Sequence, residues 1–276
     1  MTEPHTGASL PDVFSGESGL VLGIRATARA LALDAFCDAV ATARLERVRL
    51  RRAATAAPRR RVLALGIERG DQPGLLGAAR GELTRSEHDV TFATGEAGGR
   101  GKFENLNTLL ATHPPDGHDW LIVVDDDVAL PRGFLDVFIF LAERFSLRLA
   151  QPAHRYRSHA AWRVTRRRPA SLVRETAFVE IGPVSAIHAE TFSTLLPFPP
   201  LRIGWGLDAH WSAIARQHGW KLGVVDATPV RHGLRPIAAA YDRGAAIEEA
   251  TTFLARRPYT RAADAQRTIA THRGLR

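Results

Sequence analysis

The stretch WLIVVDDD, residues 120–127, decides the fold more than any other part of the sequence. Its first five residues are all apolar, which is typical of a parallel strand that is covered on both faces. Three consecutive aspartates, Asp125, Asp126 and Asp127, follow directly. In layered α/β proteins, ligands bind at the carboxyl ends of the parallel strands. The stretch therefore predicts a buried central strand whose polar end lies at a ligand-binding edge.

The neighbouring segments continue an alternation of strands and helices. Apolar runs at 62–67 and 90–94 predict two more strands, and the leucines within 103–112 share one side of a predicted helix. Pro131 is expected to open another helix, because a proline costs least in the first turn. Short connections between these elements predict an α/β fold, a Rossmann-like three-layer sandwich with a mainly parallel central sheet.

The two ends of the chain differ from this central part. Residues 1–18 are rich in Gly, Pro, Ser and Thr, and predict a disordered or weakly docked tail. The alanine-rich segment 20–52 predicts a helical extension in which Cys37, the single cysteine, is a small core residue. We therefore divide the chain into a tail with a basic helical extension (1–57), the α/β domain (58–240) and a C-terminal helical tail (241–276).

Charge is concentrated in two places. The formal net charge is +8, and the segments 44–61 and 155–174 each carry +7, which leaves −6 on the rest of the chain. An evenly basic surface would suit a nucleic acid better, so no nucleic-acid partner is expected. No apolar run reaches the roughly 18 residues of a membrane span, and the first residues are too polar for a secretory signal. We expect a cytoplasmic protein.

Each arginine cluster leaves two interpretations open. The arginines of 155–174 either form a solvated face or supply one or two guanidinium groups that clamp phosphates. The segment 44–61 either lies on an anionic bilayer as a basic amphipathic helix, giving peripheral membrane contact, or packs on the α/β domain with its arginines in water.

The acidic triplet predicts a metal site. Side chains alternate along an extended segment, so Asp125 and Asp127 should point the same way and Asp126 elsewhere. Two carboxylates on one side repel each other unless a cation lies between them. Mg²⁺ and Mn²⁺ favour such carboxylates together with water and substrate phosphate oxygens. The alternative is a solvated turn in which an aspartate caps the helix near Pro131.

The segment VDDDVALPRGFL, residues 124–135, resembles the Asp-any-Asp (DXD) motif of family-2-like glycosyltransferases with the GT-A fold. In that family the motif holds the metal ion that bridges the diphosphate of a nucleotide-sugar donor. The segment GKFENLNTLL, residues 101–110, is similar to the family's helix after the second strand, where a Lys or Arg and an Asn lie near the nucleotide. The resemblance implies a GT-A fold, Mn²⁺ or Mg²⁺ as cofactor and donor-binding roles for four residues, namely Lys102, Asn107, Asp125 and Asp126.

The downstream half of the resemblance centres on WGLD, residues 205–208, which is similar to a set of poorly characterised GT-A-like proteins. The family places a catalytic carboxylate here, which implies that Asp208 is the general base. Many members carry an acidic pair at this point, whereas this chain has a single carboxylate, so Glu180 is the reserve base. Without the resemblance, Asp208 is equally well explained as a helix N-cap.

Three further residues are candidates for the site. Glu180 is expected to contact the acceptor. Trp205 lies between two glycines that let the backbone come close, so its ring is expected to stack on a sugar of the acceptor, although core packing explains it equally well. His232, after the predicted strand at 224–230, corresponds to a histidine that often completes the family's metal shell, so the implied metal ligands are Asp125, Asp127 and His232. Elsewhere a lone histidine is more often structural, and we expect four others at the surface, namely His154, His159, His210 and His218.

These observations predict a metal-dependent glycosyltransferase. It would move a sugar from a nucleotide-sugar, expected to be a UDP-sugar, to an acceptor hydroxyl with inversion. The acceptor would be a sugar, a lipid-linked molecule or a small molecule. Two alternatives stay open: a nucleotidyltransferase that acts on a sugar phosphate, and a non-catalytic module that binds polyanions or membranes through its arginines. The segment after the first predicted strand, LGIER at 65–69, poorly matches the glycine-rich, lysine-bearing loop of a nucleotidyltransferase.

Overall fold

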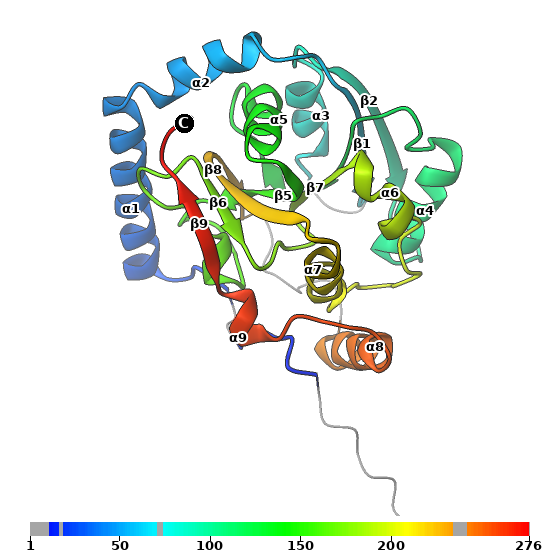
Figure 1. Cartoon of the computed structure of the whole chain (residues 1–276). Coiled ribbons are helices and arrows are strands. Elements are labelled where there is room, and N and C mark those ends of the chain that lie inside the picture. Colours follow the sequence, from blue (N-terminus) through cyan, green and yellow to red (C-terminus); the bar gives the residue numbers. More distant parts are fainter. Residues whose placement is uncertain (1–10, 17–18, 71–73, 234–241, 276) are drawn as a thin grey trace, which may run out of the picture.

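A computed structural model describes residues 11–16, 19–70, 74–233 and 242–275. Within these ranges the core is a nine-stranded mixed sheet with the order β2-β1-β3-β7-β5-β8-β6-β9, and β4 pairs with β8 outside this path (Figure 1). The strands are β1 (Arg61–Glu68), β2 (Asp89–Glu96), β3 (Trp120–Asp125), β4 (Val128–Ala129), β5 (Leu147–His154), β6 (Val173–Thr176), β7 (Val184–His188), β8 (Lys221–His232) and β9 (Thr268–His272).

Most strands of the path point the same way. The pairings make β2, β1, β3, β5, β8 and β9 run in one direction, while β7 and β6 run against them. The predicted central strand is confirmed, because residues 120–124 are all buried in β3 between β1 and β7. Its near-continuous apolar sequence is explained by helices on both of its faces.

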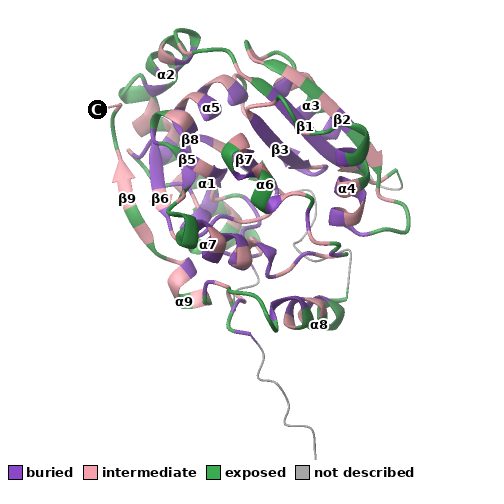
Figure 2. Cartoon of the chain, turned by 45° about the vertical axis from the view of Figure 1, so that its right-hand side comes forward, coloured by how far each residue is buried: buried purple, intermediate pink, exposed green. Residues whose placement is uncertain are grey.

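Helices cover the sheet on two sides, so the predicted three-layer α/β fold is confirmed. One apolar cluster packs α2 (Glu46–Thr55), α3 (Leu76–Leu83) and α5 (Phe134–Arg144) against one face. A second cluster packs α4 (Lys102–Thr112), α7 (Leu207–His218) and α8 (Arg243–Leu254) against the other. Figure 2 shows the buried strands between these two layers. The remaining short helices are η1 (Arg163–Thr165), η2 (Ala189–Thr191), α6 (Phe192–Leu195) and α9 (Ala262–Ala265).

The N-terminal extension consists of two helices. α1 (Ile24–Ala43) ends before Leu45, whose left-handed φ of 52° turns the chain into α2. α1 buries Ala30, Asp34 and Cys37 against the α/β layers, which confirms the expected burial of the single cysteine. Among the described residues, no helix combines the length and the apolar composition needed to cross a membrane.

Three expectations for local structure are corrected. α5 begins at Phe134 instead of Pro131, because Gly133 adopts a left-handed φ of 71° just before it. The predicted tail of residues 1–18 is docked in part, since Val13 is buried in an apolar cluster; residues 1–10 and 17–18 lie outside the described residues. The predicted C-terminal helical tail ends in β9, which pairs with β6 and extends the sheet.

Candidate active site

Several of the predicted site residues lie at one edge of the sheet, together with His154. Asp125 ends β3, His154 ends β5 and His232 ends β8, and these three strands run in the same direction. β7 runs the opposite way, so the segment that precedes it, including Glu180, also lies at this edge. This edge is where layered α/β proteins bind their ligands.

Asp125 is held by the first residue of α4. Lys102 Nζ lies 2.6 Å from Asp125 Oδ1 and donates to the carbonyl oxygen of Ile181 at 3.1 Å. A Cβ on Gly182 would lie 2.6 Å from Asp125 Oδ2, so only a glycine lets this segment approach the carboxylate so closely. The sequence analysis missed Gly182, although the Gly-Pro pair at 182–183 was a turn signal.

Asp126 points to a different element, the loop after β1. Its Oδ2 accepts a hydrogen bond of 3.2 Å from the backbone N–H of Arg69, and the Arg69 guanidinium lies 3.9 Å away. Its backbone oxygen accepts from Leu75 N–H at 2.6 Å. Asp126 therefore ties together the two ends of the described part of this loop.

Asp127 pairs with His232, which lies 105 residues further along the chain. His232 Nε2 is 3.1 Å from the Asp127 carboxylate, and Nδ1 donates to the carbonyl oxygen of His159 at 3.2 Å. Burial disfavours the charged ring, but the hydrogen bond to Asp127 and the charges of Asp127 and Asp125 outweigh it, so the pKa of His232 is raised.

The Asp127–His232 pair has the donor chemistry of a metal site. Histidines that bind metals usually donate their second ring N–H to a carbonyl or carboxylate, as His232 does to His159. Carboxylate and imidazole together suit Mn²⁺ or Zn²⁺. Within the described part of the chain, no group of three or more His, Cys, Asp or Glu side chains is arranged to hold a metal ion, so Asp125 does not join Asp127 and His232 in one cluster.

Glu180 lies in a second polar cluster beside this pair. Its Oε2 is 2.7 Å from His154 Nε2, and its Oε1 accepts from the Thr165 hydroxyl at 3.3 Å. The backbone N–H of Glu180 donates to Gln151 Oε1. His154 is buried, with 1% of its side chain exposed, and the side chain of Glu180 is 12% exposed. These contacts hold Glu180 in a defined orientation at the sheet edge.

The surface location expected for three other histidines is wrong. His154 is buried against Glu180. His159 is also buried, and its backbone carbonyl oxygen accepts a hydrogen bond from the ring of His232. His210 is half-buried, and its Nδ1 contacts the carbonyl oxygen of Pro258. His218 is exposed, as expected. The sequence contained a signal for His154, which ends a strand at the ligand-binding edge just as Asp125 does.

Asp208 is the second residue of α7, and the N-cap position belongs to Gly206. The N-cap explanation of Asp208 is therefore wrong, although its Oδ1 accepts the N–H of Ala209 at 2.9 Å. Burial, with a smaller contribution from the negative charge of Glu180, raises the pKa of Asp208 to about 7. A carboxyl group that titrates near neutral pH is suited to accept a proton.

The loop that leads to Asp208 packs on the start of α4. Lys102 N–H donates to Arg202 O at 2.9 Å, and a Cβ on Gly101 would lie 2.1 Å from the Cα of Arg202. A Cβ on Gly204 would lie 2.1 Å from the ring of Phe103. Because these positions are glycines, the loop before Asp208 packs directly on the start of α4. Lys102, which pairs with Asp125, therefore belongs to the same packed unit as this loop.

A carboxylate from α8 holds the same loop. Glu249 accepts hydrogen bonds from three consecutive backbone N–H groups, those of Arg202 at 2.7 Å, Ile203 at 3.0 Å and Gly204 at 2.7 Å. The sequence analysis missed this role, because Glu249 lies outside the region of resemblance and a glutamate within a helix carries no signal of its own.

Trp205 and Asn107 have defined positions. The Trp205 ring is half-buried, 5.6 Å from the ring of Phe14 in the N-terminal segment. The Asn107 amide donates to Phe198 O at 2.8 Å and accepts from Phe198 N at 2.9 Å. The amide nitrogen and the amide oxygen of Asn107 thus both bind the backbone of Phe198. The structure does not bring this amide to Asp125.

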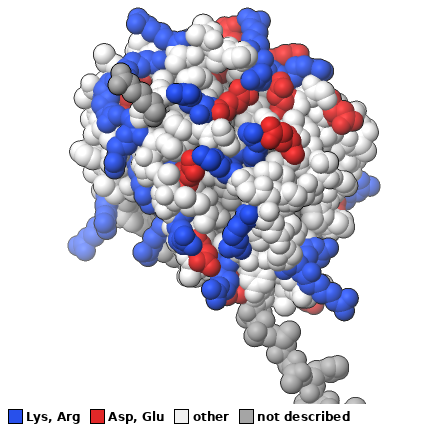
Figure 3. All heavy atoms as spheres, viewed as in Figure 1, with Lys and Arg blue, Asp and Glu red and all other residues white. Residues whose placement is uncertain are grey.

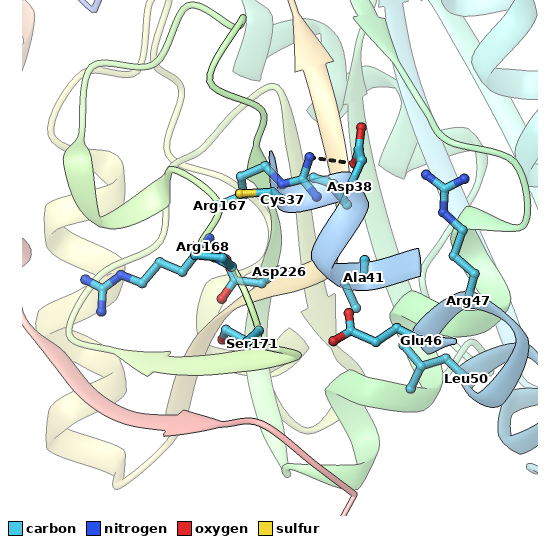
Figure 4. A pocket seen from close by; sticks show the side chains of 14 residues that line it. Cys37, Asp38, Ala41, Glu46, Arg47, Leu50, Arg167, Arg168, Ser171 and Asp226 are labelled. Carbon is cyan, nitrogen blue, oxygen red and sulfur yellow. Dashed lines mark hydrogen bonds and ion pairs between the residues drawn. The ribbon is translucent and has the colours of Figure 1, made fainter. Parts of the chain in front are cut away.

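The arginines of 155–174 are divided between the interior and the surface. Arg167 and Arg174 are buried, whereas Arg157, Arg163 and Arg168 are exposed. Arg155 Nη2 pairs with Asp38 of α1. Arg167 Nη1 lies 2.9 Å from the same carboxylate (Figure 4). The fully buried Arg174 binds Asp226 through two hydrogen bonds of 2.8 and 2.9 Å. These carboxylates therefore take up part of the cluster's charge, and this part joins α1 to the strands. The exposed members of the cluster fit the predicted solvated face.

Comparisons with known proteins give distant structural likenesses. No protein-family model matches the sequence, and no curated protein matches it. Among solved structures, A197 from STIV has a TM-score of 0.44 at 13% identity, over 64% of this chain and 87% of that protein. GalNAc-T7, solved with UDP, GalNAc and Mn²⁺, has a TM-score of 0.45 at 12% identity, over 64% of this chain and 44% of its own. Because both TM-scores are below 0.5, neither likeness bears on the function of this chain.

Proposed function

We propose that this protein is a metal-dependent glycosyltransferase that moves a sugar from a nucleoside-diphosphate sugar to an acceptor hydroxyl. The observation that carries the proposal is the pairing of Asp127 with His232 across 105 residues of sequence. Both were candidate metal ligands on the basis of sequence alone. They lie at the carboxyl edge of the sheet, beside a carboxyl group, Asp208, that titrates near neutral pH.

The proposed metal ligands are Asp125, Asp127 and His232. Asp127 and His232 fit the role by their donor types and by the carbonyl that orients the histidine ring. Asp125 is engaged by Lys102, whose ammonium group already supplies a positive charge beside the triplet. When bound, a divalent cation would neutralise the charge that develops on the leaving diphosphate.

Lys102 and Asp126 are the residues that we assign to the donor side. Lys102 presents a primary ammonium group between α4 and Asp125, where a phosphate oxygen could share its protons. Asp126 holds the loop after β1 at the same edge. We expect a UDP-sugar as the donor.

On the acceptor side, Asp208 would remove the hydroxyl proton as the sugar transfers, in a single displacement with inversion. Glu180 lies close enough to raise the pKa of Asp208 by its charge, and would orient the acceptor together with the half-buried Trp205. A base with a pKa of about 7 is partly deprotonated at neutral pH and still accepts a proton readily.

The proposal is tested by thermal unfolding with a panel of nucleoside diphosphates and nucleotide-sugars, with and without Mn²⁺. A ligand at about 100 times its Kd stabilises the folded state by about 2.7 kcal/mol. We expect UDP or a UDP-sugar to raise the Tm with Mn²⁺ present, and Asp127→Ala to abolish the shift. Asp116→Asn, which alters an exposed carboxylate in the turn before β3, is the matched control and should keep the shift.

Product analysis of the stabilising donor separates the alternatives. Release of a nucleoside diphosphate that depends on Asp127 and Asp208 supports glycosyl transfer. Pyrophosphate release from a nucleoside triphosphate and a sugar phosphate would assign the site to nucleotidyl transfer instead. No Tm shift with any nucleotide would contradict the proposal.

A further inference from the structure

The outer surface of α1 is apolar. Seven large hydrophobic side chains are exposed within the described part of the chain, and six of them lie between residues 22 and 48. They are Leu22, Ile24, Leu31, Phe36, Leu45 and Val48. Ile24 is 90% exposed and Phe36 is 57% exposed. Such a concentration of exposed apolar side chains is typical of a surface that binds another macromolecule or a membrane.

The C-terminal part of α1 exposes apolar side chains and turns its acids inward, unlike an ordinary surface helix. Its acidic residues face the protein: Asp34 accepts the backbone N–H groups of Tyr156 and Arg157, and Asp38 pairs with two arginines. The exposed residues between 30 and 43 include no charged side chain; they are Leu31, Ala32, Ala35, Phe36, Ala39, Thr42 and Ala43. A surface helix normally turns its polar stripe to water. Between Leu31 and Ala43 the acids of α1 face the protein, and an uncharged stripe about 20 Å long is left for a partner.

The charged side chains around this stripe all have one sign. Every charged residue classed as exposed between 24 and 59 is an arginine, namely Arg25, Arg29, Arg44, Arg47, Arg49, Arg51, Arg52 and Arg59. The acids of this segment are either buried, as Asp34 and Glu46 are, or paired with arginines, as Asp38 is. In Figure 3 basic side chains are frequent along the margins where Figure 1 places α1 and α2.

These features define the α1–α2 outer face, which consists of the six apolar side chains and the exposed arginines of α1 and α2. Arg59, after α2, pairs instead with Glu87 of the α/β layers. A second copy of the chain would bring two sets of arginines together without a carboxylate to separate them, which is unfavourable. A nucleic acid would satisfy the arginines but would leave leucine, isoleucine and phenylalanine without apolar partners. An anionic bilayer accepts both, because apolar side chains enter its interface while arginines meet the phosphates.

We propose that the α1–α2 outer face docks on the surface of an anionic lipid bilayer, with α1 lying parallel to the membrane. The arrangement differs from a basic amphipathic helix formed by 44–61, because α2 packs on the protein through Leu50 and Ala54. α1 supplies the apolar contact, and the arginines of both helices supply the charge. This proposal goes beyond glycosyl transfer and does not depend on it.

Flotation of the full chain with lipid vesicles tests the proposal without any nucleotide. We expect binding to phosphatidylcholine vesicles that contain phosphatidylglycerol, little binding to phosphatidylcholine alone, and weaker binding as salt rises. Leu31→Ser with Phe36→Ser removes two exposed apolar side chains and should weaken the partition coefficient about tenfold or more. Arg47→Gln with Arg52→Gln should weaken it by about 10- to 30-fold.

The control is Arg216→Gln with Arg256→Gln, which removes the same charge from exposed positions in α7 and after α8. Binding should stay as in the wild type. Since all the altered side chains are exposed, thermal unfolding should be nearly unchanged in each variant.

Three results would overturn the proposal: wild-type protein that fails to float with anionic vesicles, Leu31→Ser/Phe36→Ser protein that floats as well as wild type, or equal loss in the control. A wild-type dimer that the apolar variant converts to a monomer would assign the face to a second copy. Binding to duplex DNA or RNA that the same variants abolish, without vesicle binding, would assign it to a nucleic acid.

Discussion

At the scale of single residues, Asp208 is the residue most clearly adapted to chemistry. Its carboxyl is partly buried at the start of α7, and burial with the nearby charge of Glu180 raises its pKa to about 7. Carboxylates placed only for structure are usually held ionised by hydrogen bonds or cations. Asp208 accepts the backbone N–H of Ala209 at 2.9 Å, and burial outweighs the backbone hydrogen bonds that favour its ionised form.

The raised pKa of Asp208 predicts a pH dependence of activity. Donor turnover should rise with pH through about 7, as the carboxylate forms. Asp208→Asn should lose turnover by about 10²- to 10⁴-fold, and its residual activity should lack this acidic limb. Asp116→Asn should keep both the rate and the pH profile. An Asp208→Asn enzyme with the wild-type profile would show that another group is the base.

The raised pKa of Asp208 also predicts a pH dependence of the free energy of unfolding. In the folded protein Asp208 keeps its proton up to about pH 7, whereas in the unfolded chain it loses it near 3.8. The wild-type free energy of unfolding should therefore fall as pH rises between these values. Asp208→Asn should be more stable than wild type at pH 8, and the difference should vanish below pH 4. Urea unfolding at both pH values checks this, and an unchanged difference would contradict the raised pKa.

At the scale of elements, α8 holds the loop before Asp208 in place, although it contributes no candidate site residue. Glu249 accepts three backbone N–H groups of the loop that leads to Asp208, and the same loop packs on the start of α4 beside Lys102. A carboxylate has enough lone pairs for three donors, whereas an amide presents an N–H₂ group that would repel one of them. The position of the loop therefore depends on this one side chain.

Glu249→Gln tests this dependence. Leaving one loop N–H unpaired should cost about 1–2 kcal/mol of the free energy of unfolding. A small displacement of Asp208 should lower kcat by about tenfold or more, with little change in the KM for the donor. The matched control is Glu248→Gln, which alters the exposed neighbour on the same helix. Equal effects of the two variants would show that charge on α8, and not the loop contact, is responsible.

At the scale of the whole molecule, α1 is attached to the α/β layers through ion pairs. Asp34 and Asp38 receive two backbone N–H groups and the guanidinium groups of Arg155 and Arg167. Burial opposes the ionised form of Asp38, but the two arginines outweigh it and lower the pKa of Asp38. This contribution to docking should be present above pH 3.8 and should be lost as pH falls through the lower folded-state pKa.

Asp34→Ala with Asp38→Ala should release α1 before the layers unfold. Arg167, which is 5% exposed, would be left as a buried charge without its carboxylates, at a cost of about 3–5 kcal/mol. Hydrogen exchange should show α1 amides losing protection while β3 amides keep it. The Glu248→Gln protein should exchange like wild type. Simultaneous loss of protection in α1 and β3 would show that α1 belongs to the same cooperative unit.

Much of the fold follows from local sequence. The apolar run at 120–124 predicts the central strand because a strand covered on both faces needs apolar residues throughout. The acidic triplet is found by its place after a strand, since strand ends converge on one edge. His232 is singled out only because its position also matches the family resemblance. The orientation of α1 could not be predicted from periodicity, because its buried face contains Asp34, whose partners are backbone groups more than 120 residues away.

The sequence by itself determined the layered α/β fold and the edge at which the candidate ligands gather, because apolar runs and turn residues act through near neighbours. Only the tertiary structure decided which polar groups are paired. It brings Asp127 to His232, Glu180 to His154 and Glu249 to the loop before Asp208. It also places three arginines of 155–174, namely Arg155, Arg167 and Arg174, on carboxylates of α1 and β8. Such pairings join side chains distant in sequence, and the free energy of a buried charge depends on the partner that folding provides.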